Sequence, residues 1–109
     1  MKKYKSKEYE KDCRICGYYN EAPLNIARAV TRQVLDEEKI HYHENDFEYY
    51  IFIRGKGKVL IGEQEWQYET GDVFLIEPME KHKMVEILEE TDYITVRSNV
   101  NPGNKVVVE

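Results

Sequence analysis

The chain has 109 residues, a net charge of −5 and 34% charged residues, a length that suits one domain with a modest core. The acidic balance argues against nucleic acid as a partner, because phosphate binding needs clustered Lys and Arg. No segment approaches the roughly 20 apolar residues that span a bilayer, and the basic N-terminus lacks the apolar run of a secretory signal. Cys13 and Cys16 are too few for a disulfide framework. We therefore expect a cytoplasmic protein without a membrane partner.

Residues 1–24 show no regular period, and we expect an N-terminal arm with room for one short strand. We expect residues 25–109 to form a single barrel. From Asn25 to Leu35 the two faces alternate with period two, which is typical of a strand. Short runs rich in β-branched and aromatic residues follow, separated by turn residues. Further strands are expected at residues 40–43, 47–54, 58–61, 66–69, 73–76, 83–88, 93–98 and 105–108.

The segments between these strands have the composition of turns. Gly55-Lys56-Gly57 and Thr70-Gly71-Asp72 are glycine turns, Glu89-Glu90 is an acidic solvated turn, and residues 101–104 form a further turn cluster. Many short strands with frequent turns and no convincing helix predict an antiparallel sandwich or barrel. The strand at 47–54 has the composition of one that is buried on both faces.

All three histidines of the chain lie at positions that suit one metal site. On a strand, His41 and His43 point to the same face about 7 Å apart, at roughly 3.3 Å per residue. Glu48 opens the next strand, which an antiparallel neighbour can bring opposite this pair, and His82 comes from a distant strand. Three imidazoles and a carboxylate suit a divalent Fe, Mn, Ni or Zn ion and leave about two octahedral positions open. The alternatives are ordinary core or surface histidines, or a site that holds metal weakly.

The spacing of these residues resembles the two conserved motifs of the cupin family. The first motif matches His41, His43, Glu48 and Gly55, separated by one, four and six residues. The second matches Gly71, Pro78 and His82. The resemblance covers about residues 35–85. It implies an all-β double-stranded β-helix, a jelly-roll barrel of the RmlC-like kind, in which His41, His43, Glu48 and His82 bind one divalent transition metal ion.

The chain departs from the family pattern at two glycine positions. Leu35 stands where a glycine often precedes the first histidine, and Glu80 stands where a glycine usually follows the proline of the second motif. Glu80 is expected to make that turn less relaxed without removing a ligand.

Other residues allow a functional and a structural reading. Cys13 and Cys16 form half of a zinc-ribbon pattern, which a dimer could complete, but two incidental thiols explain them equally simply. The strand arginines Arg28, Arg32 and Arg54 suit an exposed face. Arg97 alternates with apolar residues and is the candidate for binding an anionic substrate group, if its face lines the cavity.

Two residues that share a strand face with Glu48 are expected to flank the metal. Tyr50 is a candidate proton donor and Phe52 a candidate substrate contact, although both also suit an ordinary core. Glu80 is the other candidate catalytic group. A titratable group within reach of a bound ligand would favour an enzyme over a binding module.

The sequence thus predicts a metal-dependent enzyme that acts on a small polar molecule, of the sugar-phosphate isomerase or dioxygenase type. The alternative is a non-catalytic cupin that binds or senses a small ligand. We also expect a homodimer, because the apolar strand 47–54, the strand 105–108 and the N-terminal arm each offer surface for a second copy.

Overall fold

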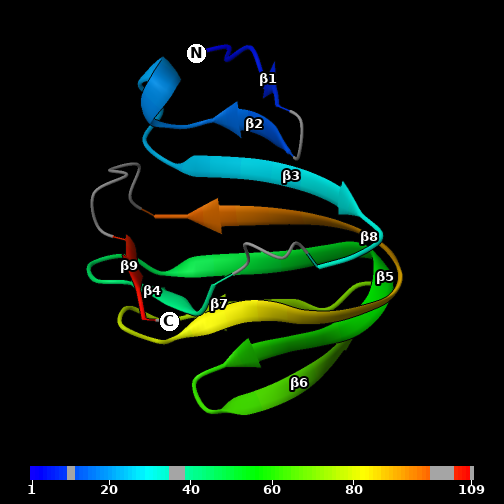
Figure 1. Ribbon diagram of the computed structural model, residues 1–109. Helices are drawn as coiled ribbons and strands as arrows, with labels where there is room; N and C mark the ends of the chain where they lie inside the picture. Colours follow the sequence, from blue (N-terminus) through cyan, green and yellow to red (C-terminus); the bar gives the residue numbers. More distant parts are fainter. Residues whose placement is uncertain (10–11, 35–38, 99–104, 109) are drawn as a thin grey trace.

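The computed structural model describes residues 1–9, 12–34, 39–98 and 105–108. Within these ranges the regular elements are strands and one short 3-10 helix, so the structure is all-β as expected (Figure 1). None of the described residues forms a helix of the length and apolar character needed to cross a membrane. In chain order the elements are β1 (Lys7–Glu8), β2 (Cys13–Cys16), η1 (Tyr18–Asn20), β3 (Asn25–Thr31), β4 (His41–His43), β5 (Glu48–Ile61), β6 (Gln64–Glu69), β7 (Val73–Ile76), β8 (His82–Arg97) and β9 (Lys105–Val107).

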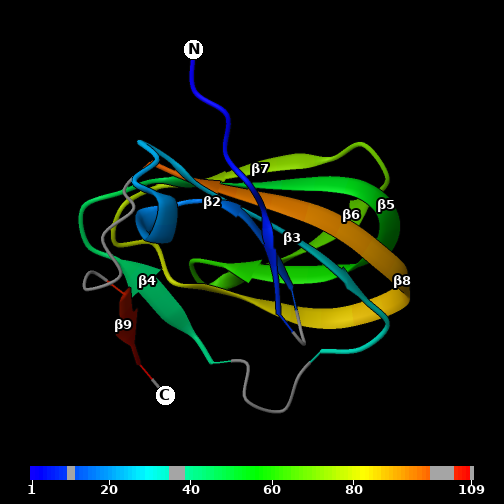
Figure 2. The same ribbon diagram turned by 90° about the horizontal axis from the view of Figure 1, so that it is seen from above.

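Two long strands, β5 and β8, are shared by the two layers of a sandwich (Figure 2). They pair antiparallel along their lengths, from Glu48 with Arg97 to Ile61 with His82. In one layer, which we call the first sheet, the first half of β5 pairs with β7. The second half of β8 pairs with β3, and β2 and β1 extend the sheet beyond β3. In the second sheet, the second half of β5 pairs with β6. The start of β8 pairs with β4, which pairs in turn with β9. This topology confirms the double-stranded β-helix.

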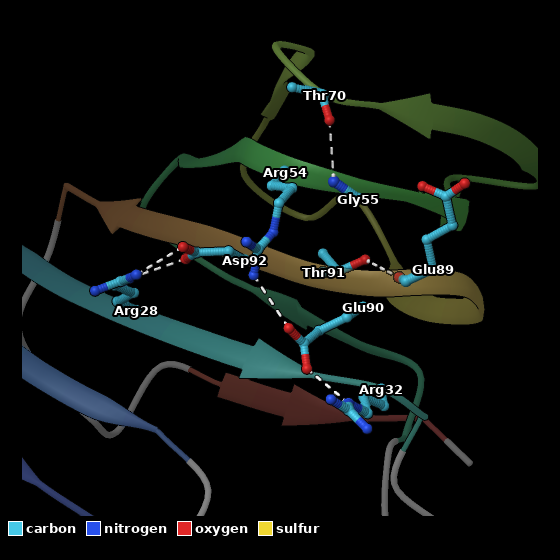
Figure 3. Close-up of polar contacts among 9 residues, drawn as sticks. All are labelled: Arg28, Arg32, Arg54, Gly55, Thr70, Glu89, Glu90, Thr91 and Asp92. Atoms are coloured by element: carbon cyan, nitrogen blue, oxygen red, sulfur yellow. Dashed lines mark hydrogen bonds and ion pairs between the residues drawn. The ribbon is translucent and has the colours of Figure 1, made fainter.

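Both long strands pass from one sheet to the other at a bend, where the pairing register shifts between Phe52 and Lys56. Gly55 lies there with φ 128°, and a Cβ atom on it would lie 2.7 Å from the Cα atom of Thr91 on β8. The Gly55 amide donates a hydrogen bond to Oγ1 of Thr70 at 3.1 Å (Figure 3). Glycine is needed here because β8 crosses too closely for a side chain.

The bend corrects two expectations. Residues 55–57 do not end a strand but lie inside β5, and Glu89-Glu90 lies inside β8 rather than in a turn between two strands. The physical reason is that bulges bend a strand without breaking its pairing. At the N-terminal side, β3 ends at Thr31 instead of Leu35, and two short strands of the arm, β1 and β2, extend the first sheet. The expected turn at 101–104 lies outside the described residues.

The core lies between the sheets, where inward-facing residues of β5, β6, β7 and β8 meet. Phe52 stacks on Tyr68 with ring centroids 3.9 Å apart, and the Tyr68 hydroxyl is hydrogen-bonded to that of Thr91 at 2.7 Å. The outward residues of the first sheet are different. Tyr49 and Ile53 on β5 are exposed, so the strand at 47–54 is buried on only one face within a single chain.

Candidate metal centre

The three histidines meet at one end of the sandwich because of the strand pairing in the second sheet. His41 on β4 is the direct cross-strand partner of His82 on β8, and His43 follows His41 on the same face, as the strand period requires. All three side chains are buried, and His82 is 0% exposed. Their ligand atoms all lie within 4.8 Å of one another, a group that could hold a metal ion.

Glu48 reaches this cluster from the first sheet. Its Oε1 atom lies 3.1 Å from Nε2 of His82 and 3.8 Å from Nε2 of His43. We expected Glu48 on the antiparallel neighbour of the histidine strand, but β4 pairs with β8 and β9, and Glu48 lies across from β8 and β7 instead. The carboxylate therefore closes the cluster from the facing layer of the sandwich.

Backbone carbonyl groups fix the ring orientation of two histidines. Nδ1 of His41 lies 2.9 Å from the Lys39 carbonyl oxygen, and Nδ1 of His82 lies 3.0 Å from that of Glu80. A carbonyl only accepts, so each Nδ1 carries the proton and each neutral ring turns its Nε2 lone pair inward. This is the arrangement in which histidines bind metal ions in proteins.

The inward nitrogen atoms fit a cation. Nε2 of His82 lies 3.1 Å from Oε1 of Glu48, a distance at which a shared proton or a cation must hold the two atoms together. Nε2 of His43 is buried and has no hydrogen-bond partner among the described residues. A buried nitrogen without a partner is costly, and a metal ion would satisfy it. Three imidazoles and a carboxylate are also a donor set of divalent transition metals.

The charge state of the site suits coordination. Burial and the nearby His82 lower the pKa of His41 to about 4, and burial lowers the pKa of His43 as well. Burial alone would raise the pKa of Glu48, but the hydrogen bond to His82 and the charges of His82, His43 and Arg97 together hold that pKa below its ordinary value. At neutral pH His41 and His43 are therefore neutral and Glu48 is ionised.

A charged pair lies behind His43. Nη1 of Arg97 is 3.5 Å from Nδ1 of His43, and Nε of Arg97 is 3.1 Å from Oδ2 of Asp46. Asp46 is buried and was not anticipated from the sequence, because no motif or period marks it within Glu44-Asn45-Asp46. Arg97 thus contacts Nδ1, the ring nitrogen other than Nε2. Its role in anion binding stays a prediction.

The remaining candidates lie at different depths. The Tyr50 ring is buried with its centroid 5.8 Å from that of His82, beside the centre. Phe52 is fully buried in the core against Tyr68, and its contact with a substrate stays a prediction. Glu80 accepts a hydrogen bond from the Glu77 amide at 3.1 Å and contributes its carbonyl to His82.

The loop before His82 also corrects one expectation about the second motif. The residue with the left-handed backbone is Met79, with φ 70°, rather than Glu80. The Met79 amide donates to the His43 carbonyl oxygen at 2.8 Å, so this strained turn ties the loop to β4. Met79 therefore occupies the position at which a glycine would relax the turn.

The cupin domain family model matches residues 30–96, and the search of curated proteins found no match. A Tyr-to-Phe variant of Streptomyces PAC13, solved with uridine, has a TM-score of 0.78 and 14% identity, over 100% of this chain and 91% of that one. Pac13 is described as a unique nucleoside dehydratase. A double-stranded β-helix protein from Klebsiella pneumoniae has a TM-score of 0.71 and 16% identity, and the match covers 97% of this chain and 91% of that one. KdgF from Halomonas sp. has a TM-score of 0.68 and 14% identity, and the match covers 91% of this chain and 89% of that one. At these identities the structures show a shared fold.

Proposed function

The chain belongs to the cupin family, and from this premise we propose that it is a metal-dependent enzyme acting on a small polar molecule. His41, His43, His82 and Glu48 would hold one divalent ion. The observation that carries this proposal is the position of Nε2 of His82, 3.1 Å from the Glu48 carboxylate in a site with two further buried imidazoles. Such an ion would supply Lewis-acid polarisation of a substrate oxygen.

The surrounding residues support catalysis more than passive binding. Glu80, whose carbonyl oxygen contacts the His82 ring, carries a second titratable group near the centre. Tyr50 lies beside His82 with a phenol that can donate to a substrate oxygen. A non-catalytic binding module would need neither group near the metal. An isomerase, a dioxygenase or a dehydratase like that described for Pac13 could each use such a centre.

Metal analysis tests this function. His41→Ala and His82→Ala should each lower metal content at least several-fold, because each removes one ligand, while Tyr42→Phe on the same strand should keep it. Circular dichroism would check that the sheets stay folded. If wild-type protein refolded with Fe, Mn, Ni and Zn binds none of them, the proposal is wrong.

We also propose that two copies of the chain associate through the outer face of the first sheet. Cross-strand register places apolar residues of β7, β5 and β8 side by side on this face. They are Val73, Leu75, Tyr49, Ile51, Ile94 and Val96. Val73 is 56% exposed and Leu75 47%, and an apolar patch of this kind on a monomer marks an interaction site.

Charged residues border this patch toward the bend. Arg28 pairs with Asp92 through two hydrogen bonds of 2.9 and 2.6 Å, and Arg32 and Arg54 share Glu90 at 2.7 and 3.1 Å (Figure 3). An apolar centre with a border of both charge signs is the composition of a self-complementary interface.

A further inference from the structure

A cavity of about 800 Å³ opens at the edge of the sandwich formed by β6 and β7. Its volume is in the range of sites for small ligands. The lining residues come from β6, β7, the end of β5 and the two loops beside them. They are Ile61, Gly62, Glu63, Gln64, Trp66, Phe74, Leu75, Glu77 and Glu80.

Trp66 marks this cavity as a binding surface. It pairs with the fully buried Val59, so its side chain lies on the inward face of β6. Tyr68, two residues further on the same face, is 1% exposed, whereas Trp66 is 45% exposed. An inward tryptophan that the core covers only partly gives up a large share of its burial energy. Departures of this kind from good packing are expected at functional sites.

The cavity borders the metal centre through three contacts. Ile61, in its wall, is the cross-strand partner of His82. Glu80, also in its wall, accepts the Nδ1 proton of His82 with its carbonyl oxygen. Phe74 is the cross-strand partner of Tyr50, which lies beside His82. The cavity therefore adjoins the metal centre, although its described lining includes none of the four candidate ligands.

The lining has a definite chemistry. Trp66 and Phe74 offer aromatic surface, on which a flat ring can stack. Gln64 offers an amide that both donates and accepts hydrogen bonds, and the carboxylates accept them from hydroxyl groups. Glu63, Glu77 and Glu80 contribute negative charge, and no Lys or Arg is among the described residues of this lining. A phosphate or carboxylate group would be repelled here.

We propose that the cavity binds a nucleoside-like compound, with a flat ring, several hydroxyl groups and no anionic group. This inference goes beyond the proposed function, because the cavity adjoins the metal centre without sharing its candidate ligands. Stacking on Trp66 holds the ring, and the glutamates accept from the hydroxyl groups. Phosphorylated compounds are excluded by charge, which argues against a sugar-phosphate substrate.

Fluorescence gives a direct test, because Trp66 is the only tryptophan of the chain. Uridine titrated into the purified, metal-analysed protein at low salt should change the fluorescence in a saturable way. Uridine 5′-monophosphate should bind about tenfold more weakly, or worse, since its negative charges would meet the three carboxylates of the lining. Added salt should reduce this difference in affinity.

Two charge-reversal variants provide the matched comparison. Glu77→Lys removes a repulsive charge from the cavity wall. It should reduce the ratio of the affinities for uridine and its monophosphate at least about threefold. Glu65 lies on β6 but outside the cavity lining, so Glu65→Lys should leave this affinity ratio as in the wild-type protein. Both exposed positions should tolerate lysine, which circular dichroism would check.

The outcomes separate this inference from the proposed function. No saturable signal with uridine at millimolar concentration, or equal binding of its monophosphate, would overturn the inference even if the protein holds its metal. A saturable, charge-selective signal in protein that binds no metal would support the cavity and contradict the metal-dependent enzyme.

Discussion

Replacing Gly55 by alanine tests whether the crossing of β5 and β8 limits the stability of the fold. Alanine at φ 128° costs about 1 kcal/mol or more in backbone strain. Its methyl group would also lie 2.7 Å from the Cα atom of Thr91, and pushing β8 away costs about 1–3 kcal/mol more. Thr91 is fully buried and bonded to Tyr68, so it has little room to move. We expect Gly55→Ala to lower the free energy of unfolding by about 3 kcal/mol.

Urea unfolding followed by circular dichroism would measure this loss. Gly71→Ala is the matched control, because Gly71 also has a positive φ, 91°, but a methyl group there would meet no other atom within 4 Å. The control should cost only the backbone strain, about 1 kcal/mol. If both variants lose the same free energy of unfolding, the steric argument is refuted and backbone strain alone accounts for the loss.

Three further predictions concern the surface, the loop and the histidines. Val73→Lys should convert a dimer into a species of one chain mass in light scattering, whereas Leu88→Lys, an exposed residue on the other half of β8, should not. Met79→Gly should raise the free energy of unfolding by about 0.5–1 kcal/mol in urea titrations, because glycine relieves the left-handed turn; a lower stability would argue against strain there. In metal-free protein, unfolded His41 titrates near pH 6.5 and folded His41 near 4, so the unfolded state binds more protons between these values. The free energy of unfolding should therefore fall by about 2 kcal/mol as pH drops through this window, after allowance for solvent screening. The urea midpoint of unfolding should change less with pH in His41→Asn than in the wild-type protein.

The sequence allowed the fold class and the histidine cluster to be predicted, because both depend on local signals. Period-two alternation marks strands, and the spacing of His41 and His43 places both on one strand face. The pairing of the strands could not be read in the same way. Gly55-Lys56-Gly57 has the composition of a turn, and only the close crossing of β8 shows that it bends a continuous strand.

The surroundings of the site depend on contacts between distant segments, which no local pattern records. Asp46 meets Arg97 only because the sandwich brings the start of β5 and the end of β8 together. Trp66 reads as an ordinary strand residue, and its exposure follows from the gap between β6 and β7. The carbonyl groups that orient His41 and His82 belong to residues whose side chains give no hint of this role.

The sharing of β5 and β8 by both sheets has a consequence for how fast the chain folds. Glu48 must find Arg97 and Ile61 must find His82 before either layer is complete, so the central pairing closes long loops at an early entropic cost. Topologies dominated by such distant pairings fold in roughly milliseconds to seconds rather than microseconds. The hairpin of β1 and β2 joins residues close in sequence and can form quickly, but it has no sheet edge to extend until β3 has docked on β8. The arm should therefore be among the last parts of the protein to gain protection in refolding.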